Sequence, residues 1–305
     1  MSELVTHLRK DIRMHMLDPM FIILLVILCG AALIVALASC AGYINSIGYG
    51  RDIVTAASLQ MQQRLVLANY WNSIAGIYMI VFTVIASLAL AGEKESGMVK
   101  YILTHRTSKL WFYISKFLIL LGVVAIAMVI ALVAYFVVFS VMDVPLLDVG
   151  ILAKSMIFPL LIALVFSALG LTISALSKKR SGAVVASVAV FVLLTFLSPV
   201  SIYLGMDAAH EVNPDANLQN VVDFIPLEYK LLIYANPLVL SYGLPMIMDV
   251  YTNTYHDLPQ LYGLEEGAAL GLFMVLTWFV IGLIGFSRER MDKGWFTRIR
   301  GRLKS

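Results

Sequence analysis

Six long apolar stretches, separated by shorter polar segments, dominate the pattern of the chain. They run from about 20 to 41, 70 to 91, 117 to 141, 155 to 176, 183 to 204 and 267 to 286. Each is long enough to cross a hydrocarbon core of about 30 Å as an α-helix. The pattern therefore predicts an all-α integral membrane protein with six transmembrane helices, forming a single transmembrane domain over residues 1–305.

The residues before the first span follow a different pattern. Leu4, Leu8, Ile12 and Met16 recur at four-residue spacing, and charged side chains fill the positions between them. This spacing gives a helix one apolar face, so we expect an amphipathic helix that lies in the membrane interface and ends before Pro19.

A seventh apolar stretch, from Phe224 to Met248, is interrupted by three prolines and contains Glu228 and Lys230. Proline breaks a helix, and irregular backbone is tolerated at membrane depth only where protein or water covers it. We interpret this stretch as re-entrant or interfacial helices within an outer segment, 205–266, between the fifth and sixth spans. A true seventh span is the alternative.

The basic residues give the spans an orientation. Eighteen of the 22 Lys and Arg residues lie on one side of a six-span arrangement, and only Arg51, Arg64, Lys154 and Lys230 lie on the other. Basic residues are concentrated on the cytoplasmic side of membrane proteins. The sequence thus predicts a multi-pass protein of the cell (cytoplasmic) membrane with both termini in the cytoplasm.

Composition excludes several classes of function. Hydrophobic residues make up 61% of the chain and charged residues 13%, which is about half the charged share of a soluble domain. No ionisable side chain falls within the hydrocarbon depth of a predicted span, which argues against a proton-coupled carrier or an intramembrane enzyme. The chain has no phosphate-binding G-x-x-x-x-G-K-[ST] motif, no zinc-ligand spacing and no basic face for nucleic acid. We expect no catalytic residue, cofactor or metal site in this chain.

Three features have an ordinary structural explanation and a functional alternative. Leu37 to Cys40 resembles a lipid-attachment motif, but also the small-residue end of a transmembrane helix. Small residues at four-residue spacing in the fourth and fifth spans fit a dimer face or internal packing. Sulfur and imidazole groups on the outer side would suit copper, or would simply fill an apolar vestibule: Met206, His210, Met246, Met248 and His256.

The most informative segment runs from Glu93 to Lys116, between the second and third spans. Two acids, Glu93 and Glu95, precede Gly97, and an amphipathic stretch follows from Met98 onward. Acids are favoured at the start of a helix, and glycine allows a sharp change of direction at the membrane surface. The pattern predicts a short cytoplasmic helix held between two spans, which fits either a force-transmitting element or an ordinary interfacial connection.

This segment resembles a motif of the ABC-2 (type-2 exporter) permease family, E-[KR]-E-x-G-T-x-x-x-L-L-S-x-P-x-S-R followed by a lysine as the next span starts. The matching positions are Glu93, Lys94, Glu95, Gly97, Ile102, Leu103, Thr104, Ser108, Lys109 and Lys116. Met98 and Arg106 stand where the family usually has Thr and Pro. The interfacial arm, the turn at Ser177–Gly182 and the broken outer segment are also similar to the family.

The resemblance implies a coupling helix that docks on a separate ABC ATPase subunit, which would bind the ATP and Mg. It implies contact residues in two places: Glu93, Glu95, Gly97, Ile102, Leu103, Arg106 and Lys109 in the first, and Lys178, Lys179 and Arg180 in a smaller second contact. The family pairs each permease with a second copy or a homologue. The basic C-terminal tail is expected to lie on anionic membrane lipid.

Two functions fit these expectations. The first is the permease subunit of an ATP-driven exporter. The second is an ATPase-coupled scaffold or mechanical transmitter that acts on an outer-face partner, for example in metalloenzyme maturation, without moving a substrate. The outer segment motivates the second, because it carries nine acids against Lys230 alone, a charge that would suit a cationic partner or would simply be solvated.

Overall fold

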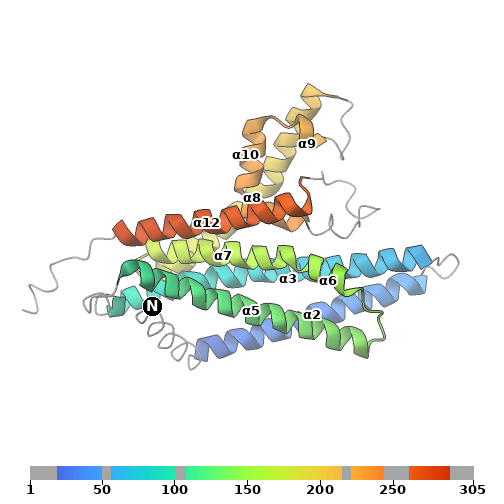
Figure 1. Ribbon diagram of the computed structural model, residues 1–305, viewed down its shortest axis with the longest axis horizontal. Helices are drawn as coiled ribbons and strands as arrows, with labels where there is room; N and C mark the ends of the chain where they lie inside the picture. The colour runs from blue at the N-terminus through green and yellow to red at the C-terminus, as the bar shows by residue number, and fades with distance from the viewer. Residues whose placement is uncertain (1–18, 50–55, 100–107, 215–220, 244–260, 289–305) are drawn as a thin grey trace, which may run out of the picture.

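The computed structural model describes residues 19–49, 56–99, 108–214, 221–243 and 261–288, and their regular structure is entirely helical (Figure 1). The elements are α2 (Pro19–Tyr49), α3 (Ala56–Glu95), α5 (Lys109–Val141), α6 (Val149–Ser155), α7 (Ile157–Leu176), α8 (Arg180–Val212), α9 (Val221–Phe224), α10 (Leu227–Ala235), η1 (Pro237–Tyr242) and α12 (Leu264–Arg288). Six stretches are long and apolar enough to span a membrane: α2, α3, α5, α6 with α7, α8 and α12. The predicted all-α membrane fold with six transmembrane helices is confirmed, whereas the amphipathic N-terminal arm lies outside the described residues.

Helix α7 forms the centre of the bundle. It packs chiefly on α3 and α12, while α5 packs chiefly on α2. α7 approaches α3 closely at Gly170, where an added Cβ would lie 2.4 Å from the backbone oxygen of Thr83. Ala163 and Ser167, two of the small residues whose role the sequence left open, are buried on α7. In this chain they therefore serve internal packing.

Several helices continue beyond the apolar stretches that predicted them. The second stretch begins near residue 70, but α3 begins at Ala56 and so includes the polar run Gln62, Gln63 and Arg64. Similarly, the fifth stretch ends near residue 204, but α8 continues to Val212. A hydropathy pattern marks the part of a helix that lies in hydrocarbon, whereas a helix continues until its backbone is capped or broken.

The fourth span is divided into α6 and α7 at Met156. Pro159 follows this break closely, and a proline ring clashes with the carbonyl four residues earlier and offers no N–H to it. The carbonyl concerned belongs to Ser155, the last residue of α6. The ring clash and the missing N–H of Pro159 therefore account for the interruption of the helix at Met156.

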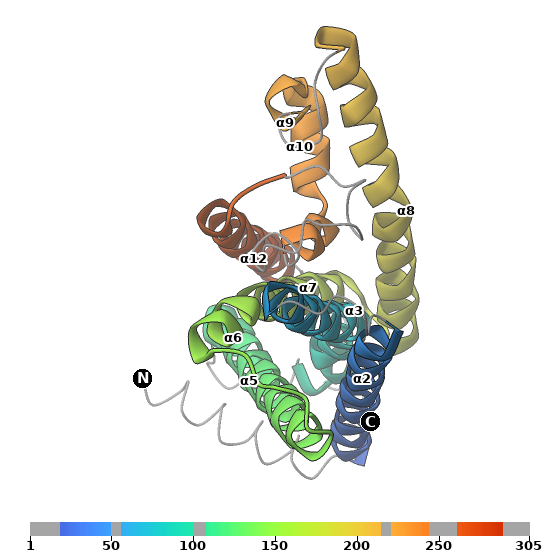
Figure 2. The same ribbon diagram turned by 90° about the vertical axis from the view of Figure 1, so that its right-hand side faces the viewer.

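The outer segment is built on the second half of α8, which diverges from the other long helices (Figures 1 and 2). Helices α9 and α10 pack beside it, and Pro226 and Pro237 stand at the starts of α10 and η1. Within the described residues, Phe224–Gly243 thus forms short helices that are not long enough to span the membrane. The remaining part of this stretch, 244–260, lies outside the described residues.

Asn236 links η1 to α8. Its Oδ1 accepts a hydrogen bond from the Leu238 N–H (3.0 Å), and its Nδ2 donates to the carbonyl oxygen of Leu194 on α8 (2.9 Å). The side chain is 6% exposed, so these two bonds satisfy a polar group that burial would otherwise penalise. One residue therefore caps η1 and fixes it to the long helix.

Candidate functional site

The described parts of the motif segment, 93–99 and 108–116, lie where five helix ends meet, at the left-hand end of the bundle in Figure 1. We call this region the basic end. It comprises the C-terminal ends of α3, α7 and α12 and the N-terminal ends of α5 and α8. Glu93, Lys94 and Glu95 occupy the last turn of α3 and each contacts a different neighbouring helix.

Glu93 points toward α5 and forms a buried ion pair. Lys116 Nζ donates to Glu93 Oε1 at 2.6 Å, and the two side chains are 1% and 14% exposed, respectively. The ammonium group also lies 5.3 Å from the centroid of the Phe112 ring, a cation–π contact. Among the described residues, Glu93 Oε2 has no hydrogen-bond partner although it is buried. The carboxylate is thus directed into the protein and held by one residue of the following span.

Lys94 points toward the end of α7. Its Nζ donates to the carbonyl oxygens of Ala175 (2.5 Å) and Ser177 (3.4 Å), and it lies 5.5 Å from the centroid of the Phe286 ring on α12. Carbonyl groups at the C-terminal end of a helix lack intrahelical donors and carry partial negative charge. A lysine at this position therefore satisfies the end of the central helix.

Glu95 contacts the start of α8. Its Oε2 accepts a hydrogen bond from the backbone N–H of Arg180 at 2.9 Å, and a carboxylate at a helix N-terminus is favoured by the helix dipole. The Arg180 side chain lies against Gly92, where an added Cβ would be 2.7 Å from Nε. A side chain at Gly92 would require the Arg180 guanidinium to shift.

The backbone leaves α3 at Gly97, which has a φ of +76°. This left-handed conformation is typical of the residue just after a helix C-terminus and favours glycine. Gly97 N–H donates to the Lys94 carbonyl at 3.1 Å. The change of direction predicted for Gly97 is therefore present.

The other residues predicted to contact an ATPase fall into two groups. Lys178 and Lys179 are exposed, and Lys109 Nζ donates to the Ser287 carbonyl oxygen of α12 at 3.1 Å. Ile102, Leu103 and Arg106 lie outside the described residues. The structure thus brings the turn after α7 next to the end of α3, since Glu95 binds the first residue of α8.

The sequence reasoning did not include Lys116 or Gly92 among the site residues. Lys116 was part of the motif, but nothing in a single sequence shows that it pairs with a carboxylate 23 positions earlier. A lysine at the edge of an apolar span is expected to have a counter-charge at the same membrane depth, and this expectation points to a partner for Lys116.

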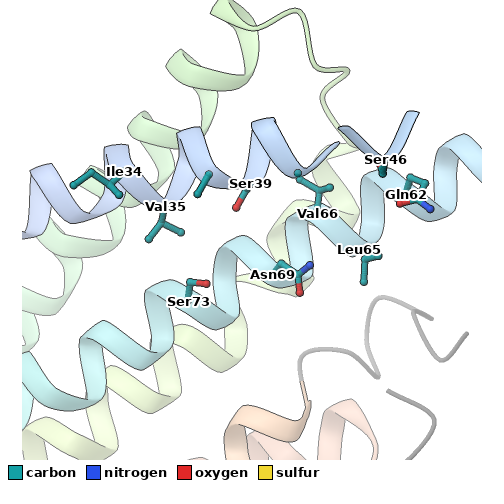
Figure 3. Close-up of a pocket in the computed structure, with 11 residues that line it drawn as sticks. Ile34, Val35, Ser39, Ser46, Gln62, Leu65, Val66, Asn69 and Ser73 are labelled. Atoms are coloured by element: carbon teal, nitrogen blue, oxygen red, sulfur yellow. The ribbon is translucent and has the colours of Figure 1, made fainter. Parts of the chain in front are cut away.

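A second feature is a groove of about 380 Å³ between α2 and α3, lined by 11 residues (Figure 3). Its lining contains no ionisable side chain, and its polar groups are Ser39, Ser46, Gln62, Asn69 and Ser73. The groove offers hydrogen bonds and apolar contacts but no charge. Cys40, the last residue of the motif that resembles a lipid-attachment site, is buried beside it within the continuous helix α2.

Metal binding finds no support in the part of the chain that the structure describes, because it contains no group of three or more His, Cys, Asp or Glu placed to hold an ion. Met206 and His210 lie on α8, and the other three residues considered for copper fall in 244–260, outside the described residues. The basic end thus combines buried contacts that fix helix ends with exposed cationic side chains beside them.

Comparison with known protein families identifies the family of the chain. The family model described as "ABC-2 family transporter protein" matches residues 44–229, more than half of the chain. A comparison with curated protein sequences gives no match. The matched region includes α3, α5, α7, α8 and the whole of the Glu93–Lys116 segment. The chain therefore belongs to the ABC-2 transporter family and is a membrane permease of an ABC transporter.

Proposed function

We propose that this chain couples ATP hydrolysis on a separate ATPase subunit to outward translocation of a substrate. The main support for this proposal is the set of contacts at the basic end. A segment that begins with Glu93-Lys-Glu leaves the membrane there, and its first three residues contact α5, α7 and α8. A force applied to this segment acts on three helices at once.

The proposed contact surface consists of the segment after Gly97 together with the turn at Lys178–Arg180. Glu95, Lys178, Lys179 and Arg180 are exposed, so they are accessible to a partner. Ile102, Leu103 and Arg106 complete this surface as a prediction from the motif, and Lys109 closes it at the start of α5. Glu93 contributes by holding the segment in place, because its bound oxygen faces Lys116.

The proposal implies an orientation and a set of partners. Both termini lie in the cytoplasm, which places the basic end on the side where ATP is available. The ATPase subunit binds ATP and Mg, and a second permease, either a copy or a homologue, completes the transporter. Residues Arg288 to Lys304 contact anionic lipid headgroups.

Co-purification tests the coupling. The chain is expressed with the ATPase encoded nearest to it and purified in mild detergent, alongside a variant carrying both Lys178→Glu and Lys179→Glu. We expect the unchanged chain to retain the ATPase and the variant to lose most of it, because two exposed cations become anions at the proposed contact.

The matched control is Lys154→Glu together with Lys230→Glu, which makes the same charge change at residues predicted to lie on the outer side. Failure of the unchanged chain to bind any ATPase would contradict the proposal. Equal loss in the control would show a general effect of charge rather than a contact.

The second candidate, a mechanical transmitter acting on an outer-face partner, is favoured by the projecting part of α8 and α10. These helices carry Asp207, Glu211 and Glu228 at exposed positions away from the main bundle (Figure 1). A cationic partner protein would find complementary charge there. ATPase activity stimulated by small substrates would favour transport, whereas stimulation only by a partner protein would favour this alternative.

A further inference from the structure

We propose that Lys116 is a positioning residue that, through its ion pair with Glu93, makes the ends of α3 and α5 move as one body. The inference rests on the proposed function, because the movement in question is the one that a bound ATPase would cause. It assigns a role to a residue that lies away from the proposed contact surface.

The burial of the pair is the first part of the case. Lys116 is 1% exposed, and its ammonium group is bonded to Glu93 Oε1 at 2.6 Å. A buried charge without its counter-charge is strongly unfavourable, so neither helix end can move away from the other without exposing both groups or leaving them unpaired. The pair therefore penalises separation of the two helix ends.

The second part is the position of the pair. α3 packs chiefly on α7, and α5 packs chiefly on α2, so these two helices have different principal partners in the bundle. Glu93 lies in the last turn of α3 and Lys116 in the third turn of α5. The ion pair joins the two helices at the ends where the intervening segment begins and finishes.

Contacts deeper in the bundle extend the connection. Tyr78 Oη donates to the Ala127 carbonyl at 2.7 Å, and Tyr70 Oη donates to the Ala131 carbonyl at 2.6 Å. Both bonds run from α3 to α5, so three polar contacts join these helices over more than six turns of α3. A displacement at the basic end would thus reach both helices along their length.

Three further contacts at the basic end join a side chain to a backbone group. Lys94, Lys109 and Glu95 bond to backbone carbonyl or N–H groups, which remain available when a neighbouring side chain changes. The Glu93–Lys116 pair depends on two side chains of opposite charge, and it can be broken or rebuilt by substitution.

The test measures movement in the assembled complex with its ATPase, in nanodiscs, with Cys29 and Cys40 replaced by alanine. Two spin-label pairs are used, one at a time and diluted with unlabelled chain. Gln60 with Tyr203 reports α3 against α8, and Val141 with Tyr203 reports α5 against α8; all three positions are exposed. Distances are measured by double electron–electron resonance with and without trapping by ATP and vanadate.

In the unchanged chain we expect trapping to shift both distances. In Lys116→Met we expect one of the two shifts to fall at least two-fold while the ATPase remains bound. Exchange of the two charges, Glu93→Lys with Lys116→Glu, should restore both shifts. Lys154→Met, the same substitution at an exposed lysine of α6, should retain both.

Retention of both full shifts in an assembled Lys116→Met complex would overturn the inference. If Lys116→Met does not fold, the double variant Glu93→Met with Lys116→Met is measured instead, because proteins commonly tolerate the replacement of a buried ion pair by apolar side chains. Loss of one of the two distance shifts in the double variant supports the inference. Retention of both distance shifts overturns it. Absence of a bound ATPase in the unchanged chain would overturn the proposed function, and this inference with it.

Discussion

Three consecutive residues at the end of α3 reach three different helices because successive side chains on a helix are about 100° apart. Glu93 contacts α5, Lys94 contacts the end of α7, and Glu95 contacts the start of α8. The alternation of charge follows from the targets: a lysine, a pair of carbonyl oxygens and a backbone N–H. The Glu-Lys-Glu order thus has a structural reason within this chain, in addition to any contact with a partner.

Gly97 offers a prediction about backbone conformation. Substitution by alanine would meet no atom within 4 Å, so its cost comes from the φ of +76°. We expect Gly97→Ala to destabilise the protein by about 1 kcal/mol, measured as a lower midpoint of thermal unfolding in detergent. Gly122→Ala on α5 also meets no neighbour but has helical backbone, so it should leave the midpoint unchanged or raise it. The same sign in both variants would contradict this explanation.

At the scale of the element, the close packing of α3 on α7 depends on the absence of a side chain at Gly170. An alanine there would bring Cβ to within 2.4 Å of the Thr83 backbone oxygen, and the backbone cannot yield as a flexible side chain does. We expect Gly170→Ala to cost about 1–3 kcal/mol, measured by chemical denaturation in detergent. Gly76→Ala on α3 has no neighbour within 4 Å and is the control; an equal loss in both variants would show that this contact does not limit stability.

Asn236 makes a prediction for the outer helices. Asn236→Ala removes the cap of η1 and the bond to the Leu194 carbonyl, at a cost of about 1–2 kcal/mol. We expect faster hydrogen–deuterium exchange in α10 and η1, with exchange in α7 unchanged. Thr195→Ala on α8 removes only a bond within its own helix and should leave the exchange of α10 as it was. Unchanged exchange in Asn236→Ala would mean that the two bonds do not hold this region.

The elements show what a sequence pattern is able to predict. Each of the six predicted spans corresponds to a helical span, since hydrocarbon requires a run of apolar residues and a helical backbone. The ends of α3 and α8 were not predictable from hydropathy, because polar residues continue both helices into water. The pairing of Glu93 with Lys116 was not predictable either, because it depends on how two helices pack rather than on either sequence pattern.

At the scale of the whole molecule, the arrangement of the helices was not predictable from the sequence. The 18-residue apolar windows of the span formed by α6 with α7 and of α8 have nearly equal mean hydropathy, 2.5 and 2.4, yet 78% of the first window and 17% of the second are buried within the chain. Lipid and protein interior are equally apolar, so hydropathy cannot distinguish a central helix from a peripheral one. The exposed apolar faces of α2 and α8 are therefore available to lipid or to another protein chain.

The proposed orientation is testable by labelling with a membrane-impermeant thiol reagent. Single cysteines are placed at exposed positions in a background without Cys29 and Cys40: Val149 and Val212 on the expected outer side and Ser108 at the basic end. We expect the first two to react in intact cells and the cysteine at 108 to react only after permeabilisation, because basic residues favour the cytoplasmic side. The reverse pattern would contradict the orientation and the proposed ATPase contact together.

The length of α3 has a mechanical consequence. This helix has 40 residues, so it is about 60 Å long and roughly twice as long as the hydrocarbon core is thick. In the proposed orientation the inner end of α3, at Glu93–Glu95, contacts three neighbouring helices, and the opposite end lies on the outer side of the membrane. By simple geometry, a tilt of only ~5° about the inner end would carry the tip near Ala56 through ~5 Å. With the ATPase bound as proposed, a very small rearrangement beside it would become a displacement on the opposite side that is large enough to open or close a passage for water.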